Sequence, residues 1–235
     1  MPGVGTIFLL GGTNDLFGVA LRWKRHLAAT GLMHHLIPIR WQLGGWSILT
    51  FADLRRTDHH RREADRLAAR IREAQCDRPG EPIHVISHSA GTAVTCYAIE
   101  QLAPDEAITS VVFVGSALSP GYDLSPLLHR CHAGMLAIDS PLDLLFLGAG
   151  TRVFGTADRV RTSAAGRVGF DHNADAPSAK LHRLRWTPKQ IRGGWFGGHM
   201  SITAPGFVRT VLATWIRDAE RRALTQVGSI PEKIP

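Results

Sequence analysis

The feature that most constrains the fold is a repeated alternation of short apolar runs with longer segments of helical periodicity. The short runs are typical of buried strands and span residues 4–10, 35–39, 83–87, 108–114, 135–138 and 181–186. Between several of them, apolar residues recur at three- and four-residue spacing, which is typical of helices packed on a sheet. Strand and helix in alternation predict an α/β fold, with a mostly parallel central sheet and helices on both faces.

Local details sharpen this prediction. Pro38 lies inside the second run, and because proline cannot donate to a strand ladder, we expect that strand near an edge of the sheet. Asn14 or Asp15 follows the turn after the first run and could cap the next helix, which closes at Gly31. The length fits one domain over residues 1–235, and the connections between strands are too short for a large cap domain.

Charge and cysteine content argue against several classes of protein. The net charge is +7, but the basic residues are scattered and many alternate with acids, so no nucleic-acid partner is expected. No stretch approaches the ~20 apolar residues of a membrane span, and the first ten residues do not resemble a secretory leader. Three widely spaced cysteines form neither a disulfide framework nor a zinc motif, which favours a reducing, cytoplasmic setting.

A serine follows the third strand at the point where a helix begins. Residues 87–91 read Ser-His-Ser-Ala-Gly, which places Ser89 at a sharp strand–turn–helix elbow. The residues two before and two after such a serine must be small, because the strand and helix backbones cross closely there. Gly91 meets this requirement fully, and Ser87 replaces the glycine that is usual at its position. We therefore predict that Ser89 is a nucleophile; the alternative is an ordinary helix-capping serine.

A serine nucleophile needs a base to take its proton and an acid to orient that base. His199 lies in a glycine-rich loop between the last strand and the last helix, where the base is expected. Asp143 lies in the turn after the fifth strand, where a carboxylate can reach the nucleophile. The competing acids are Asp139, which could instead brace the turn through backbone hydrogen bonds, and the loop residues Asp123 and Asp158.

Acyl transfer also needs two N–H donors aimed at the developing oxyanion. One is expected from Ala90, directly after the nucleophile. The other is expected from the turn after the first strand, where Thr13 is preferred to Gly12. Aromatic residues on nearby loops could line a substrate pocket, and Trp46 and Trp195 are the candidates; each could equally pack under its own loop.

The sequence carries no motif for a metal or a nucleotide. Histidine pairs occur at residues 34–35 and 59–60, but neighbouring histidines point apart on a strand, and no acid or cysteine cluster accompanies them. We expect a surface or capping role for both pairs. Neither glycine-rich nucleotide-binding pattern is present, so no cofactor is expected, and nothing in the sequence indicates an oligomeric state.

Together these motifs resemble the α/β-hydrolase superfamily, in particular its lipase-like and esterase-like members. The resemblance is carried by residues 9–13, 87–91, 138–143 and 198–199. Gly11 departs from the pattern, because many members have a histidine there. The resemblance implies a serine hydrolase that cleaves small-molecule acyl esters through an acyl-enzyme on Ser89, Asp143 and His199. The alternatives are a thioesterase or acyltransferase on the same triad, or a catalytically silent binding protein.

Overall fold

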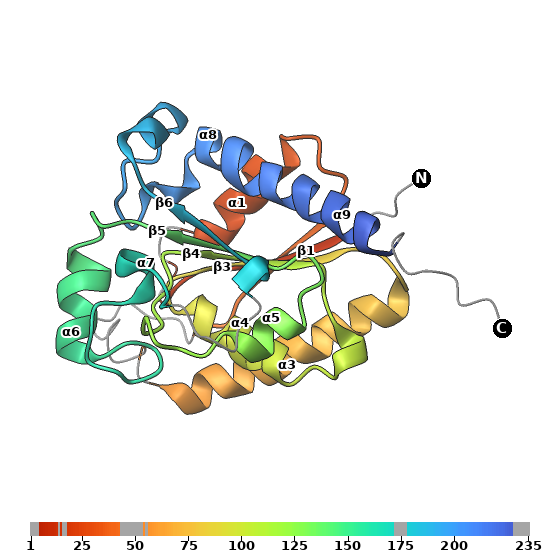
Figure 1. Ribbon diagram of the computed structural model, residues 1–235, viewed down its shortest axis with the longest axis horizontal. Coiled ribbons are helices and arrows are strands. Elements are labelled where there is room, and N and C mark those ends of the chain that lie inside the picture. Colours follow the sequence, from red (N-terminus) through yellow and green to blue (C-terminus); the bar gives the residue numbers. More distant parts are fainter. Residues whose placement is uncertain are drawn as a thin grey trace.

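A sheet of six parallel strands forms the centre of the protein, as the computed structural model in Figure 1 shows. The structure describes residues 5–13, 15, 18–42, 54, 56–171 and 178–227. The spatial order of the strands is β2-β1-β3-β4-β5-β6. Their bounds are β1 (Thr6–Leu10), β2 (His35–Ile39), β3 (Ile83–His88), β4 (Ser110–Val114), β5 (Met135–Asp139) and β6 (Leu181–Arg185). The predicted parallel sheet is confirmed, and each predicted strand is present with ends shifted by at most two residues.

The interior strands are buried throughout, and are mostly apolar, because both of their faces are covered. Every residue of β1, β3, β4 and β5 is buried. The outer strands β2 and β6 are only partly buried. Pro38 pairs with Leu9 on the edge strand β2, as predicted, so its missing N–H costs no ladder hydrogen bond on the open side.

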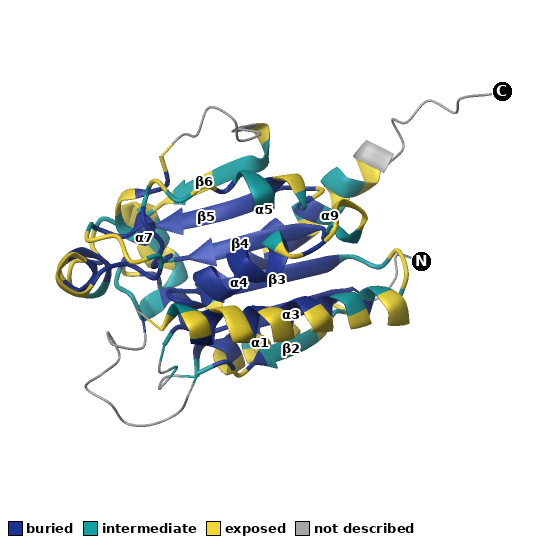
Figure 2. Cartoon of the chain, turned by 90° about the horizontal axis from the view of Figure 1, so that it is seen from below, coloured by how far each residue is buried: buried dark blue, intermediate teal, exposed yellow. Residues whose placement is uncertain are grey.

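Helices cover the sheet on both sides (Figures 1 and 2). One side carries α1 (Val19–Ala28) and α9 (Ala213–Val227), and the other carries α3 (Thr57–Asp77), α4 (Gly91–Glu100) and α5 (Ser125–His129). Each side has its own apolar cluster. Ile7 of β1 enters the cluster with Trp23, whereas Phe8 enters the cluster with Leu67, as the two-residue period of a strand requires.

Shorter helices connect these layers. They are η1 (Pro104–Glu106), the π-helical turn η2 (Leu145–Gly150), α6 (Thr151–Phe154), α7 (Ala165–Val168), η3 (Ser178–Lys180), η4 (Pro188–Gly193), η5 (Ser201–Thr203), α8 (Pro205–Phe207) and the π-helical turn η6 (Val208–Leu212). In its described residues the stretch expected to be irregular, residues 148–178, contains the short helices α6 and α7, and the last helix begins with α8 and η6 rather than as one regular helix. Within the described residues there is no large cap domain, as expected. No described helix has the length and apolar character that crossing a membrane requires.

The first helix begins as the sequence suggested. The Asp15 carboxylate accepts hydrogen bonds from the backbone N–H groups of Val19, at 2.6 Å, and Ala20, at 3.4 Å. These are N–H groups that a helix start leaves without an internal partner. Asp15 therefore provides the capping that its position predicted, and Gly18 supplies the left-handed turn before the helix, with φ of 58°.

Gly91 allows the start of α4 to touch the end of β1. A Cβ atom at this position would lie 2.4 Å from the Gly11 carbonyl oxygen and 3.2 Å from Leu10 Cβ. The requirement for a small residue after the elbow thus has a specific cause, which is the backbone that leaves β1.

We expect Gly91→Ala to lower the free energy of unfolding by about 1–3 kcal/mol, because overpacking against backbone cannot be relieved by a side-chain rotation. Urea denaturation measures this change. Gly121→Ala is the matched control, since the nearest atom to its Cβ would be at 3.8 Å, and we expect it to change stability by less than about 0.5 kcal/mol. Equal losses in the two variants would show that the contact with Gly11 does not limit residue 91.

Candidate active site

The candidate site lies where the order of the strands reverses. From β1 the chain moves outward to β2 and then returns to the other side of β1 to form β3. Ligands bind beyond the carboxyl ends of the strands at such a switch point. Ser89 directly follows β3, and the turn at residues 11–13 directly follows β1, so both lie at this point.

Ser89 occupies a strained turn that the surrounding backbone holds in place. Its φ is 53°, a left-handed value that a non-glycine residue rarely adopts. The Ser89 N–H donates to the Val114 carbonyl at 3.2 Å, and the Ser89 carbonyl accepts from the Ala117 N–H at 3.2 Å and from the Thr92 hydroxyl at 2.6 Å. These bonds use only the backbone of Ser89, so they fix the elbow without engaging the hydroxyl.

His199 and Asp143 form a short, buried hydrogen-bonded pair. His199 Nδ1 lies 2.5 Å from Asp143 Oδ2, and the two side chains are only 9% and 5% exposed. The other oxygen of Asp143 accepts the Leu147 N–H at 3.3 Å. A carboxylate at Nδ1 favours the tautomer with the proton on Nδ1, which leaves Nε2 free to act as a base.

Aromatic rings hold the imidazole of His199 on two sides. The Phe146 ring stacks on it with 4.8 Å between centroids, and the His88 ring contacts it with 4.4 Å between centroids. The loop that carries His199 is tied to the end of β6, because Trp186 Nε1 donates to the Trp195 carbonyl at 2.9 Å. The orientation of His199 therefore depends on packing as well as on Asp143.

The turn after β1 contacts Ser89 directly. A Cβ atom on Gly12 would lie 2.9 Å from Ser89 Cβ and 3.4 Å from Ser89 Oγ. Trp41 Nε1 donates to the Gly11 carbonyl at 2.9 Å, and Gln42 Nε2 donates to the Gly12 carbonyl at 3.0 Å. Because the C=O and N–H of one peptide point in opposite directions, the bond from Gln42 also fixes the direction of the Thr13 N–H.

A comparison with protein families agrees with this geometry. A family model described as alpha/beta hydrolase matches residues 47–138, which include the elbow and the two strand-to-helix transitions from β3 to α4 and from β4 to α5. The match and the parallel sheet agree with the resemblance expected from the sequence. The chain has the α/β-hydrolase fold.

Three solved structures align with more than nine-tenths of this chain, at low sequence identity. A pyrethroid hydrolase is 12% identical, with 94% of this chain and 99% of that chain covered and a TM-score of 0.48. A cutinase-like protein from Cryptococcus sp. is 14% identical, with coverage of 92% and 94% and a TM-score of 0.44. A poly(3-hydroxybutyrate) depolymerase from Bordetella parapertussis is 13% identical, with coverage of 95% and 84% and a TM-score of 0.46. A search of curated proteins finds no match.

The four candidate acids have different partners. Of these, Asp143 is the one that contacts His199. Asp139 forms ion pairs with Arg183, at 2.5 Å, and Arg185, at 3.1 Å, so the expectation that it braces the turn through backbone hydrogen bonds is wrong. Among the remaining contacts, Asp158 accepts from the hydroxyls of Ser119 and Thr156, and Asp123 accepts from the Ser125 N–H.

The link between nucleophile and base stays a prediction. Within the part of the chain that the structure describes, Ser89 Oγ makes no hydrogen bond, and His88 and Gly115 lie beside His199 at the same end of the sheet. In unliganded enzymes such catalytic hydrogen bonds are often long and tighten only when substrate binds. The roles of Ala90 and Thr13 as oxyanion donors stay predictions as well.

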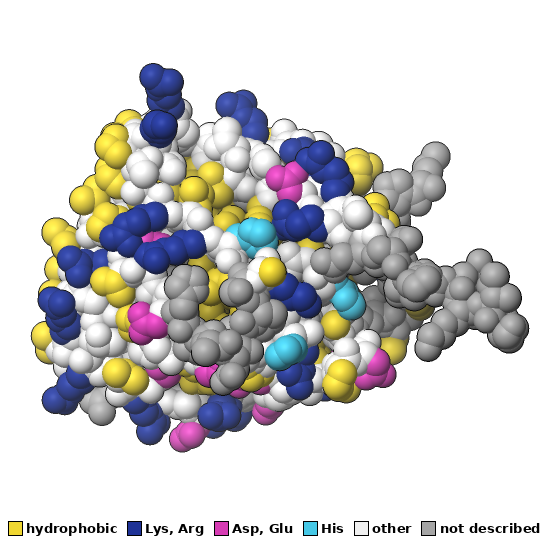
Figure 3. All heavy atoms as spheres, viewed as in Figure 1, with side chains coloured by type: hydrophobic (Ala, Val, Ile, Leu, Met, Phe, Trp, Pro, Cys, Tyr) yellow, Lys and Arg dark blue, Asp and Glu magenta, His cyan; other side chains and the backbone are white. Residues whose placement is uncertain are grey.

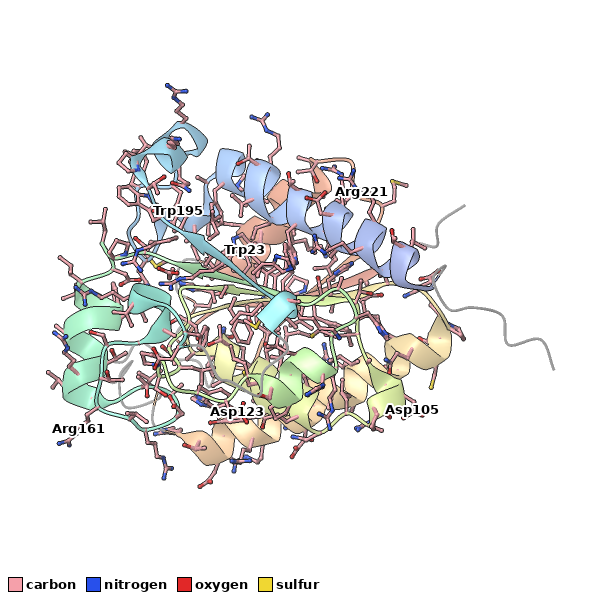
Figure 4. All side chains as sticks on the ribbon, viewed as in Figure 1. Trp23, Asp105, Asp123, Arg161, Trp195 and Arg221 are labelled. Carbon is pink, nitrogen blue, oxygen red and sulfur yellow. The ribbon has the colours of Figure 1, made fainter. Side chains whose placement is uncertain are left out.

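Trp195 is buried at 2% exposure and packs on Phe207, with 5.1 Å between ring centroids. Figure 4 shows it with Trp23 on the α1–α9 side of the sheet. It also lines a small cavity of about 10 Å³ beside His199, room for roughly one water molecule. The expected substrate contact of Trp195 stays a prediction, and Trp46 lies outside the described residues.

The structure corrects the expectation for one histidine pair. His59 and His60 are 9% and 0% exposed and pack against the Trp41 ring, so a surface role for this pair is wrong. His59 Nε2 lies 2.7 Å from the Trp41 carbonyl. The pair therefore supports the tryptophan that holds the turn after β1. Sequence reasoning missed Trp41, Gln42 and His59 as supporting residues. Trp41 and Gln42 contact the turn across 30 residues of sequence, and His59 contacts Trp41 across 18 residues.

His88 is a buried histidine next to His199. Burial lowers its pKa well below the usual value of 6.5, and the nearby His199 lowers it further. His88 therefore stays neutral in the folded protein at a pH where the unfolded chain would bind a proton. Because the unfolded state binds the extra proton, the stability of the protein falls as the pH drops below about 6.5.

We expect the free energy of unfolding to fall between about pH 7.5 and about pH 5.5, with His88 contributing about 1 kcal/mol of the loss. In His88→Phe this contribution disappears, so the fall is smaller by that amount. Urea denaturation at the two pH values measures the free energy of unfolding of each variant, and the difference between the two pH values is the fall. His35→Gln, which removes an exposed histidine, is the control and should retain the full fall. An unchanged fall in His88→Phe would contradict a neutral buried His88.

Proposed function

We propose that this α/β hydrolase cleaves carboxylic esters through an acyl-enzyme formed on Ser89. The observation that carries the proposal is the 2.5 Å contact between His199 Nδ1 and Asp143 Oδ2. It lies at the same end of the sheet as a serine held at φ of 53°. A strained serine, an acid and a base, in this chain order, are the parts that nucleophilic acyl transfer requires.

In the first half of the reaction, Ser89 Oγ attacks the ester carbonyl carbon while His199 Nε2 takes the hydroxyl proton. The tetrahedral oxyanion forms beside the N–H groups of Ala90 and Thr13, which stabilise its charge. Collapse of this intermediate breaks the C–O bond, and His199 returns the proton to the leaving alcohol. In the second half, His199 removes a proton from water, which attacks the acyl group and releases the acid and free Ser89.

The support for the oxyanion donors comes from how their peptides are held. Ala90 directly precedes α4, so its N–H belongs to a helix start, where partial positive charge accumulates. The Thr13 N–H is fixed through the bond from Gln42 to the Gly12 carbonyl. Both donors are oriented before a substrate arrives, which is what oxyanion stabilisation requires.

Apolar side chains near the site favour substrates with an apolar acyl or alcohol group. Exposed leucines precede and follow the catalytic acid, and Phe196, three residues before His199, is 63% exposed. Exposed apolar side chains beside a reactive group can contact an apolar substrate. The leucines and their exposed fractions are Leu142 at 47%, Leu144 at 58% and Leu145 at 70%.

The basic residues give no second candidate function. Figure 3 shows Lys and Arg side chains spread over the face in view, between hydrophobic and acidic ones, rather than gathered in one patch. Nucleic-acid binding uses such a patch or stripe. The absence of a nucleic-acid partner stays a prediction.

The test is a comparison of substrates that share one acyl chain but differ in the leaving group. We expect an oxygen ester to be hydrolysed faster than the matching thioester and amide, with kcat/KM as the measured quantity. Faster turnover of the thioester would assign the triad to a thioesterase or acyltransferase. Turnover of amides or epoxides in preference to every ester tested would overturn the proposal.

A further inference from the structure

A second cluster of polar side chains lies at the opposite end of the sheet from Ser89. His84 is the second residue of β3, five residues before Ser89, which separates them by about 16 Å along the strand. Glu220 comes from α9, and His34 immediately precedes β2. In Figure 1 this is the end of the sheet at which α9 finishes.

The two imidazoles point at one carboxylate oxygen. His34 Nε2 lies 2.6 Å from Glu220 Oε1, and His84 Nε2 lies 3.3 Å from the same atom. The three potential ligand atoms all lie within 4.8 Å of one another. The side chains of His34 and His84 are 8% and 0% exposed, whereas that of Glu220 is 26% exposed, which leaves one side of the cluster open to solvent.

Contacts behind the cluster fix the two histidine rings. His84 Nδ1 lies 2.8 Å from the Ser110 hydroxyl, which also accepts a hydrogen bond from Trp215 Nε1 at 3.1 Å. A hydroxyl at Nδ1 orients the ring and leaves Nε2 to face the cluster, which is how outer contacts support metal-binding histidines. The His34 ring packs closely on Gly5, where a Cβ atom would lie 2.9 Å from His34 Cδ2.

We propose that His34, His84 and Glu220 bind a divalent transition-metal ion, Zn²⁺ in the first instance, with water as the remaining ligand. Two imidazoles and one carboxylate are a donor set that zinc accepts. A tetrahedral ion with bonds of about 2.0–2.1 Å holds its ligand atoms about 3.3 Å apart. The separation from His84 Nε2 to Glu220 Oε1 already has this value, and the separation from His34 Nε2 must lengthen by about 0.7 Å.

Glu220 is the side chain that can make this adjustment, because it is the most exposed of the three and lies on a surface helix. Its exposed side is also the path by which an ion would enter. The bound ion would join α9 to the starts of β2 and β3. A ligand that binds only the folded state stabilises it, so the metal would raise the melting temperature.

The experiment uses the full chain, treated with a chelator and dialysed. Isothermal titration with Zn²⁺ measures affinity and stoichiometry, and titration with Co²⁺ reports coordination through its visible absorption. We compare wild type with His34→Gln and Glu220→Gln, and leave the fully buried His84 unchanged. The matched control is His35→Gln, which removes the exposed histidine next to His34.

We expect one ion per chain in wild type and in His35→Gln, and at least about tenfold weaker binding in His34→Gln and Glu220→Gln. Zn²⁺ should raise the melting temperature of wild type and of the control, but not of the two variants. Circular dichroism establishes that each variant is folded. Absence of binding by wild type, or equal binding in the folded variants, would overturn the proposal and leave a cluster joined by hydrogen bonds alone.

Discussion

Alanine in place of Ser89 is expected to abolish covalent labelling by a fluorophosphonate and to lower kcat for an ester substrate by roughly 10⁴- to 10⁶-fold. The substitution removes the attacking oxygen and little else. The backbone bonds of Ser89 to Val114 and Ala117 do not involve the hydroxyl, so the elbow should persist. Intact mass after incubation measures the labelling, with one adduct on wild type and none on the variant.

Ser87→Ala is the matched control for this experiment. Ser87 lies two residues earlier on the same strand, is fully buried, and its hydroxyl has no hydrogen-bond partner in the described structure. Its loss should therefore leave labelling and kcat close to wild type. An adduct that persists on Ser89→Ala would place the nucleophile elsewhere. A folded wild type that gains no adduct would favour a catalytically silent member of the fold.

The sheet could be predicted from sequence because each strand can be recognised from its own residues. Buried parallel strands are short apolar runs, and β1, β3, β4 and β5 all have this form. Even the edge position of β2 followed from the single residue Pro38. The helices after β5 were harder to predict, because α6 and α7 have four residues each and are too short to show a helical period.

The candidate catalytic residues could be located because the chain order of this architecture limits where each can lie. The topology rule directed attention to loops after the strands, and Asp143 and His199 from two such loops are in contact. Their sequence separation of 56 residues shows no pattern by itself. Without the rule about loops, nothing local distinguishes His199 from the other histidines of the chain.

The polar contacts between distant segments could not be predicted. His34 and His84 meet Glu220 across 186 and 136 residues of sequence, and the three belong to different elements. In the sequence, the residues considered for metal binding were adjacent histidines. A metal site instead needs residues that converge in space. The support of the turn after β1 by Trp41 was missed for the same reason.

Asparagine in place of Asp143 is expected to lower kcat by about 10³- to 10⁴-fold with a smaller change in KM. The carboxylate holds the Nδ1 proton of His199, whereas an amide can present an N–H to Nδ1 and favour the wrong tautomer. The substitution also removes the negative charge that stabilises the His199 imidazolium formed during attack. Steady-state kinetics on the best ester, below the unfolding temperature of every variant, measures the change.

Asp139→Asn separates the role of the catalytic acid from that of a buried carboxylate in general. Asp139 is 2% exposed, and both of its oxygens face Arg183 and Arg185 rather than His199. We expect this variant to lose stability, because two arginines lose their charged partner, but to keep kcat within about tenfold of wild type. If folded Asp139→Asn instead lost as much kcat as Asp143→Asn, the orientation of His199 would depend on both carboxylates. A loss confined to Asp139→Asn would move the acid to the end of β5 itself.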